Sequence, residues 1–370
     1  MTLTGAQARG RRLRVHRLDE RAPREALLDV AGALCGVHAQ LQSSAELALW
    51  ARVEGVRPGD LDRALWEERT LVKTWAIRGT LHLLPAAELG LWLAALGTYR
   101  HYLRPSWFTA FGIAPDELET LIAAISEALR GRELTRNELA VHVAQITGSP
   151  DLSAKLEDSW GAYLKPAAFR GHLCFAPPAG QNVRFTHPET WLSEWRTAGE
   201  DTALAEVTRR YLHAYGPATR EDYGRWWGVS PAQALARLRA LDDVVEVDVD
   251  GRPGLMLAAD AAEAQDAPPT GAVRLLPAFD PYVVGSSRED TDVLAAEHKA
   301  RVHRPQGWIS AVLLVDGRIE GVWRHEHRGG RLAVEIRPFA APGDDVRAGA
   351  EEQARRLAAF LGGELELTWS

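Results

Sequence analysis

Cysteine is scarce in this chain, and it does not form the patterns of a disulfide framework or a zinc site. The 370 residues include only Cys35 and Cys174, both in apolar surroundings and neither in a CxxC pair. Two thiols of this kind suit a reducing compartment better than an oxidising one. We therefore expect a cytoplasmic protein without a metal ion.

Long hydrophobic runs and several enzyme motifs are also missing. No apolar run approaches the roughly 20 residues of a membrane-spanning helix. The arginines near the N-terminus do not adjoin the apolar segment of a secretory signal. GxGxxG, P-loop and HExxH motifs do not occur. These absences predict no membrane partner, no cofactor and no metal chemistry.

The formal net charge of −7 excludes a surface that is positive throughout. It does not exclude nucleic-acid binding, which depends on the local field of one groove. Basic residues gather in two places: seven arginines lie between Arg9 and Arg24, and three arginines with two histidines lie between Arg324 and Arg331. Each cluster fits either a solvated helix or loop, or a contact with DNA.

One order of elements, helices followed by a β-hairpin, recurs three times. In the first copy we expect helices near Ala26–Leu34 and Ser44–Val53, a third helix with Asp60 as its N-cap, and a hairpin over Leu71–Pro85 broken at Gly79. In the second copy we expect helices over Glu117–Leu129, Thr135–Ala144 (with a Thr135/Glu138 capping box) and Asp158–Ala168, and strands over Gly171–Phe175 and Val183–Phe185. In the third we expect helices over Thr202–Tyr215, Thr219–Trp227 and Ser230–Leu241, and a hairpin over Val244–Leu257.

This order is typical of winged-helix domains, and three copies are harder to obtain by accident than one. We expect an α+β, mostly α fold with winged helices at residues 1–105, 106–198 and 199–260. Residues 261–370 are expected to form a linker and a β-rich tail packed on the third winged helix. The alternative is an α+β enzyme whose helices and hairpins only imitate this order.

The tail is expected to be an antiparallel sheet. A low-complexity linker, acidic over Ala258–Asp266, ends at Pro268–Gly271. Strands are expected over Arg274–Leu276, Ile309–Val315, Arg318–Arg324, Leu332–Ile336 and Glu364–Thr368, with a helix over Asp344–Leu361.

Two polar residues at spacing i, i+2 stand out between the first two helices. His38 and Gln40 lie in Val37-His38-Ala39-Gln40, where the chain passes from one helix to the next. On an extended segment, side chains at this spacing point the same way. They could face one pocket. Alternatively, His38 caps a helix or hydrogen-bonds a buried carbonyl, and Gln40 is a surface residue without a function.

Three stretches together resemble one bacterial family. They are Trp75–Leu83 (WAIRGTLHL), Leu276–Tyr282 (LPAFDPY), and Val315–Arg318 (VDGR) with Gly321–Arg324 (GVWR). In this order they resemble the tandem winged-helix DNA glycosylases, the AlkZ/YcaQ-like family. The resemblance runs from about residue 10 to residue 340. It implies a C-shaped monomer that excises N-alkylated purines from double-stranded DNA, in some members including interstrand crosslinks.

The resemblance also implies a catalytic motif, Gln-x-Gln or Gln-x-Asp, after the first helix. Here the matching residues are His38 and Gln40, so histidine replaces the first glutamine; His-x-Gln points to the AlkZ-like branch of the family. Gln40-Leu41-Gln42 spells the motif literally but lies two residues late, which leaves Gln42 as a possible cleft-lining residue.

The expected chemistry needs no strong acid. An N7- or N3-alkylated purine already carries positive charge, so it leaves readily through an oxocarbenium-like state. In this hypothesis the Gln40 carbonyl oxygen orients a water, and His38 orients the water or takes its proton.

Further residues are candidates for contact with DNA. Lys73, Arg78 and His82 lie on the first wing, and Arg324, His325, His327, Arg328 and Arg331 lie on the tail hairpin. The alternatives are a solvated hairpin tip and, for His82, a core position. Lys73 and Arg78 would face opposite sides of a regular strand, so joint contact needs a break at Gly79. Asp280 and Arg288 could line the cleft, or form a structural ion pair, which we favour.

The sequence therefore predicts a monofunctional DNA glycosylase with no cofactor. The alternative is a non-catalytic winged-helix regulator or damage-binding module. Such regulators usually dimerise to match two half-sites, and the chain shows no heptad pattern for a dimer helix.

Overall fold

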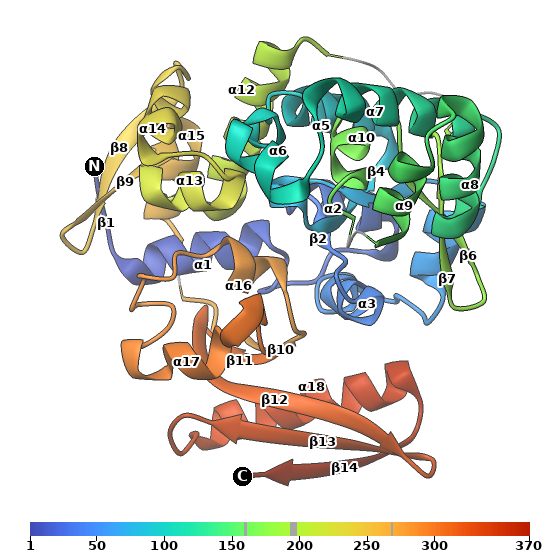
Figure 1. The fold of residues 1–370 in the computed structure, drawn as a ribbon. Coiled ribbons are helices and arrows are strands. Elements are labelled where there is room, and N and C mark those ends of the chain that lie inside the picture. Colours follow the sequence, from blue (N-terminus) through green and yellow to red (C-terminus); the bar gives the residue numbers. More distant parts are fainter. Residues whose placement is uncertain (159–160, 193–197, 268) are drawn as a thin grey trace. The chain divides into compact units, whose positions relative to one another are not determined.

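The computed structural model of the chain describes residues 1–158, 161–192, 198–267 and 269–370 (Figure 1). These residues form two compact units. One contains residues 1–60 and 208–370, and the other contains residues 61–207. The described helices include none that is both long enough and apolar enough to span a membrane. The finer division at residues 105, 198 and 260 stays a prediction.

The first repeat of helices and a hairpin has the expected order. Its elements are α2 (Leu27–Ala33), α3 (Gln42–Trp50), α4 (Asp60–Asp62, continued by a π-helical turn, Arg63–Glu67), β3 (Leu71–Trp75) and β4 (Leu81–Pro85). A 3₁₀ turn interrupts the hairpin where we expected a break, with Gly79 at φ 69°. Asp60 is the first residue of its helix rather than the N-cap before it. Its carboxylate instead accepts the Arg57 N–H at 2.9 Å and pairs with Arg24 at 2.8 Å.

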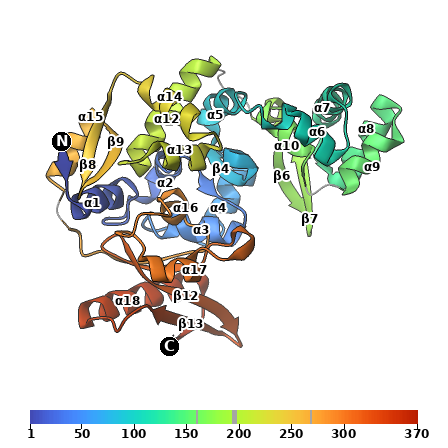
Figure 2. The same cartoon turned by 60° about the vertical axis from the view of Figure 1, so that its left-hand side comes forward.

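The second repeat lies wholly within residues 61–207 (Figure 2). Its elements are α5 (Leu89–Leu96), α6 (Pro105–Phe111), α7 (Pro115–Leu129), β5 (Leu134–Thr135), α8 (Arg136–Thr147), α9 (Pro150–Asp158), α10 (Leu164–Phe169), β6 (Cys174–Ala179), β7 (Asn182–Thr186) and α11 (Pro188–Trp191). The Thr135/Glu138 capping box is confirmed. The single helix expected over Asp158–Ala168 is wrong, because α9 ends at Asp158 and α10 begins at Leu164. Residues 159–160 lie outside the described chain.

The third repeat follows the predicted order closely. Its elements are α12 (Glu200–Tyr215), α13 (Arg220–Trp227), α14 (Pro231–Arg239), β8 (Val244–Val249) and β9 (Arg252–Leu257). Thr219 and Ser230 cap α13 and α14 through capping boxes. The N-terminal strand β1 (Thr2–Leu3) pairs in parallel with β8, a long-range contact that local sequence does not reveal.

The acidic stretch after this hairpin is not a linker. Residues Ala258–Gln265 form helix α15, which packs between the hairpin and helix α1 (Gly5–Val15). Leu3, Met256, Ala261 and Ala264 share one core there. Alanine is a strong helix former, so a composition that suggested low complexity also encodes a packed helix.

The tail forms a five-stranded sheet with helix α18 (Asp344–Leu361) against it (Figure 1). Its strands are β10 (Val273–Leu276), β11 (Val312–Val315), β12 (Arg318–Arg328), β13 (Arg331–Pro338) and β14 (Glu364–Trp369). The short helices α16 (Pro281–Gly285) and α17 (Lys299–Val302) precede β11. The sheet is mixed rather than antiparallel, because α18 returns the chain so that β14 pairs in parallel with β13.

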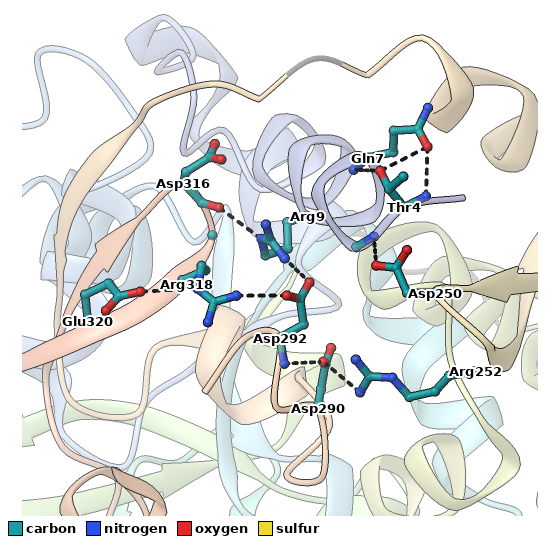
Figure 3. Close-up of polar contacts among 12 residues, drawn as sticks. Thr4, Gln7, Arg9, Asp250, Arg252, Asp290, Asp292, Asp316, Arg318 and Glu320 are labelled. Carbon is teal, nitrogen blue, oxygen red and sulfur yellow. Dashed lines mark hydrogen bonds and ion pairs between the residues drawn. The ribbon is translucent and has the colours of Figure 1, made fainter. Parts of the chain in front are cut away.

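The arginines near the N-terminus are largely structural. Arg11 is completely buried and pairs with Asp260 at 2.6 Å. Arg9 bonds Asp292, which Arg318 also binds at 2.8 Å, so that one carboxylate joins helix α1 to the tail sheet (Figure 3). The expectation of a solvated or DNA-facing cluster is therefore wrong for these arginines, because acids distant in sequence neutralise them in the core.

Candidate active site

His38 and Gln40 lie on the short connection between α2 and α3, with His38 in a two-residue strand and Gln40 in the bend that follows it. Strand β2 is Val37–His38, and it follows a tight turn with Cys35 at φ 59° and Gly36 at φ 89°. Burial alternates along the segment: Val37 and Ala39 are completely buried, His38 is half-buried and Gln40 is exposed. The side chains of His38 and Gln40 therefore stay out of the core that buries Val37 and Ala39.

Helix α3 begins two residues after Gln40. Its N-cap is Leu41, and its first turn contains no acidic residue. Backbone N–H groups at a helix start carry partial positive charge. The exposed side of Gln40 is therefore next to an electropositive end that suits a phosphate group. Gln42 is half-buried as the first residue of the helix, whereas Gln40 is the more exposed of the two glutamines.

Tyr215 contacts the turn that precedes the His38–Gln40 motif. Its hydroxyl donates a hydrogen bond to the Leu34 carbonyl at 2.9 Å, and the ring is 4% exposed. Burial raises the pKa of Tyr215 well above its ordinary value, so the hydroxyl keeps its proton and stays a donor. His16 packs edge-on against this ring with centroids 5.2 Å apart. The turn therefore rests on the buried aromatic rings of Tyr215 and His16.

A buried ion pair holds the helix that follows the motif. Arg52, just after α3, donates two hydrogen bonds to Asp280 at 2.6 and 2.8 Å, and both side chains are 0% exposed. Asp280 also accepts the Tyr282 N–H at 2.9 Å and so caps α16. Asp280 therefore cannot line a cleft, and the expected structural role is observed with a different partner. Arg288, the other expected member of that pair, is exposed on the loop after α16.

The basic residues of the first wing belong to the other compact unit. Lys73 is half-buried over the Phe175 ring at 5.7 Å, and desolvation lowers its pKa. Arg78 is half-buried in the 3₁₀ turn that breaks the hairpin. His82 is 1% exposed, and burial lowers its pKa to about 4. A DNA contact by His82 is therefore contradicted, and the alternative of a core histidine is confirmed.

The tail hairpin is exposed, and its basic residues divide between two faces. In the β12–β13 register Arg324 is opposite Glu335 and Arg328 is opposite Arg331, so these arginines share one face. His325 and His327 alternate with them and face the other side, where His325 stacks on Trp323 with centroids 5.4 Å apart. A flat surface of DNA could not touch both sets, whereas a hairpin placed in a groove could.

Acids partly neutralise this hairpin. Arg324 pairs with Glu335, Arg328 with Glu326 at 2.7 Å, and Arg331 with Glu364 at 3.7 Å. The sequence interpretation also missed a third basic segment, Lys299–Arg304 (KARVHR), which contains no acid. A search for high net charge in a short sliding window would have found this segment, whereas a search for arginine-rich runs did not.

Comparisons with known proteins agree with one another. A family model described as "DNA glycosylase AlkZ-like" matches residues 31–360. An interstrand DNA cross-link repair glycosylase of Streptomyces sahachiroi is 38% identical over 302 residues, which cover 80% of this chain and 81% of that protein. The solved structure of S. sahachiroi DNA glycosylase AlkZ matches with a TM-score of 0.91 and 34% identity, over 100% of both chains. This likeness confirms the expected α+β fold with winged helices and a β-rich C-terminal region.

Proposed function

The chain belongs to the AlkZ-like DNA glycosylases, hydrolases of N-glycosyl bonds in DNA, and on this premise we propose its substrate and its catalytic pair. The substrate is duplex DNA that carries cationic N-alkylated purines such as 7-alkylguanine, including interstrand cross-links of the kind named for the Streptomyces relative. The catalytic pair is His38 and Gln40. The observation that carries this proposal is that both side chains stay out of the core, on a segment whose flanks are fixed by the Tyr215 hydrogen bond and the Arg52–Asp280 ion pair.

The chemistry follows from the charge of the leaving group. When the bond between C1′ and the purine nitrogen breaks, its electron pair neutralises the cationic base, so no proton donor is needed. The sugar becomes oxocarbenium-like, and a water oxygen bonds to C1′ as the water loses a proton. The protein has to place that water and accept its proton.

His38 and Gln40 suit these two tasks. The Gln40 carbonyl oxygen accepts a hydrogen bond from the water and orients it, because an amide keeps its acceptor at every physiological pH. The His38 imidazole, in its neutral form, is a base that takes the proton as the water attacks. Burial of Val37 and Ala39 fixes the backbone that carries His38 and Gln40. The two side chains are therefore positioned for the water before it binds.

Contacts with the duplex come from residues outside the motif. We assign Arg324, Arg328 and Arg331 on one face of the tail hairpin, and His325 and His327 on the other, to a hairpin that enters a groove of DNA. Lys73 and Arg78 on the first wing and Arg288 on the loop after α16 add phosphate contacts.

A glycosylase assay on methylated duplex DNA separates this function from its rival. We expect free 7-methylguanine and an alkali-labile abasic site, both absent with undamaged duplex. Release of base without an added metal or cofactor is expected. Tight binding to the methylated duplex with no released base and no abasic site would favour a non-catalytic damage-binding module instead.

A further inference from the structure

Four arginines surround a cavity on the tail sheet, at the opposite end of the β12–β13 hairpin from its tip. The cavity has a volume of about 440 Å³. It is lined by Arg301, Arg304, Ser310, Val322, Trp323, Arg324, Glu335 and Arg337, and we call it the arginine cavity. One carboxylate therefore faces four guanidinium groups.

One wall of the arginine cavity is a face of the sheet. Val322 pairs with Arg337 and Arg324 pairs with Glu335, so these four side chains share a face. Glu335 accepts hydrogen bonds from Arg324, from Arg337 at 2.7 Å and from the Ser370 hydroxyl at 2.7 Å. These bonds lower the pKa of Glu335 to about 2. Glu335 is therefore ionised, and although it bonds both arginines, its single negative charge balances only one of their two positive charges.

The other wall comes from the basic segment Lys299–Arg304. Arg301 lies over the Phe339 ring, 4.6 Å from its centroid, and Arg304 is exposed. Within the described part of the chain, neither arginine has a carboxylate partner. Completely buried Val302 anchors the segment between them. Neighbouring His303 has a pKa lowered to about 4, first by burial and then by Arg288, Lys299 and Arg225.

The arginine cavity is joined to the His38–Gln40 segment within one compact unit. Trp323 donates its indole N–H to the Leu276 carbonyl at 2.8 Å, at the end of β10. Four residues after Leu276, Asp280 accepts hydrogen bonds from Arg52, which follows helix α3. A group bound in the cavity would thus be held by the framework that holds the candidate catalytic segment.

We propose that the arginine cavity binds a phosphodiester group of duplex DNA away from the excised nucleotide. Guanidinium groups match phosphate oxygens in a forked geometry. A free phosphate presents the same oxygens, but the DNA backbone is favoured because Arg324, Arg328 and Arg331 extend this sheet face to the hairpin tip, where Glu326 is the acid between them. This inference rests on the proposed function, since it adds a backbone contact to a DNA glycosylase.

The test is the salt dependence of binding to an undamaged fluorescent duplex, which requires no catalysis. Loss of two phosphate contacts in Arg301→Ala/Arg304→Ala should reduce the slope of log affinity against log salt by about 1.8. Affinity at low salt should fall about 10-fold or more. Arg301→Lys/Arg304→Lys should keep most of the slope. The control Arg347→Ala/Arg355→Ala removes two exposed arginines from α18 and should leave both quantities unchanged.

The outcomes separate three cases. A slope and affinity equal to wild type in the folded Arg301→Ala/Arg304→Ala variant, checked by its melting temperature, would overturn the proposal. Inorganic phosphate that raises the melting temperature of wild type but not of the variant, with an unchanged DNA slope, would overturn it in favour of a free-phosphate site. If the variant has a reduced slope but the wild-type protein releases no 7-methylguanine, the result would support the arginine cavity and refute the proposed function.

Discussion

His38→Ala and Gln40→Ala should each slow excision of 7-methylguanine by about 100-fold or more. Positioned acid–base groups typically contribute about 10²- to 10⁴-fold, and each substitution removes one half of the arrangement that orients and deprotonates the water. The rate should be measured in single turnover with enzyme in excess, so that product release does not limit it. The double variant should be little slower than the slower single variant, because the pair acts on one water.

Ser43→Ala provides the matched control. Ser43 is exposed in the first turn of α3, close in sequence to the motif but without a proposed role. Its excision rate should equal that of wild type. Retention of at least one third of the wild-type rate by both His38→Ala and Gln40→Ala would refute the assignment of the catalytic pair.

Asp280→Asn should reduce the free energy of unfolding by about 3–5 kcal/mol, the usual cost of leaving one member of a buried ion pair uncompensated. Both Asp280 and Arg52 are 0% exposed, and two hydrogen bonds join them. Asparagine keeps the size of the side chain and an acceptor for the Tyr282 N–H, so the main loss is the negative charge beside Arg52. Equilibrium denaturation by urea measures the change.

An exposed ion pair gives the comparison. Glu326→Gln removes the partner of Arg328 at the hairpin tip, where both side chains are exposed, and should leave the denaturation midpoint unchanged. Combining Arg52→Met with Asp280→Asn should cost less than the sum of the two single substitutions, because no unpaired charge remains. Additive costs, or an Asp280→Asn variant as stable as wild type, would show that the pair does not stabilise the fold.

Local signals in the sequence predicted local structure well. The predicted Thr135/Glu138 capping box defines a helix start through contacts three residues apart, and it is observed. Helix α18 has the predicted bounds, since its apolar period and its following glycines are both local. The i, i+2 spacing of His38 and Gln40 matches the alternating burial of residues 37–40, and their joint role in one site stays a prediction.

Long-range pairing accounts for what was missed. Arg52 and Asp280 are 228 residues apart in the chain, so nothing near either of them marks the other as its partner. The sequence around Arg11 does not distinguish it from a solvated arginine. It can be buried because helix α15 places Asp260 beside it. The parallel strand β14 was misjudged for a related reason: strand periodicity predicts a strand but not its direction beside a neighbour.

The pH dependence of single-turnover excision tests the catalytic role of His38 most directly. A histidine side chain ordinarily titrates near about 6.5, and a base must be neutral to accept a proton. The wild-type rate should therefore rise with pH through that region and level off by about pH 8, whereas His38→Gln should be slower and flat. A wild-type rate that is flat from about pH 5.5 to 8 would contradict His38 as the base.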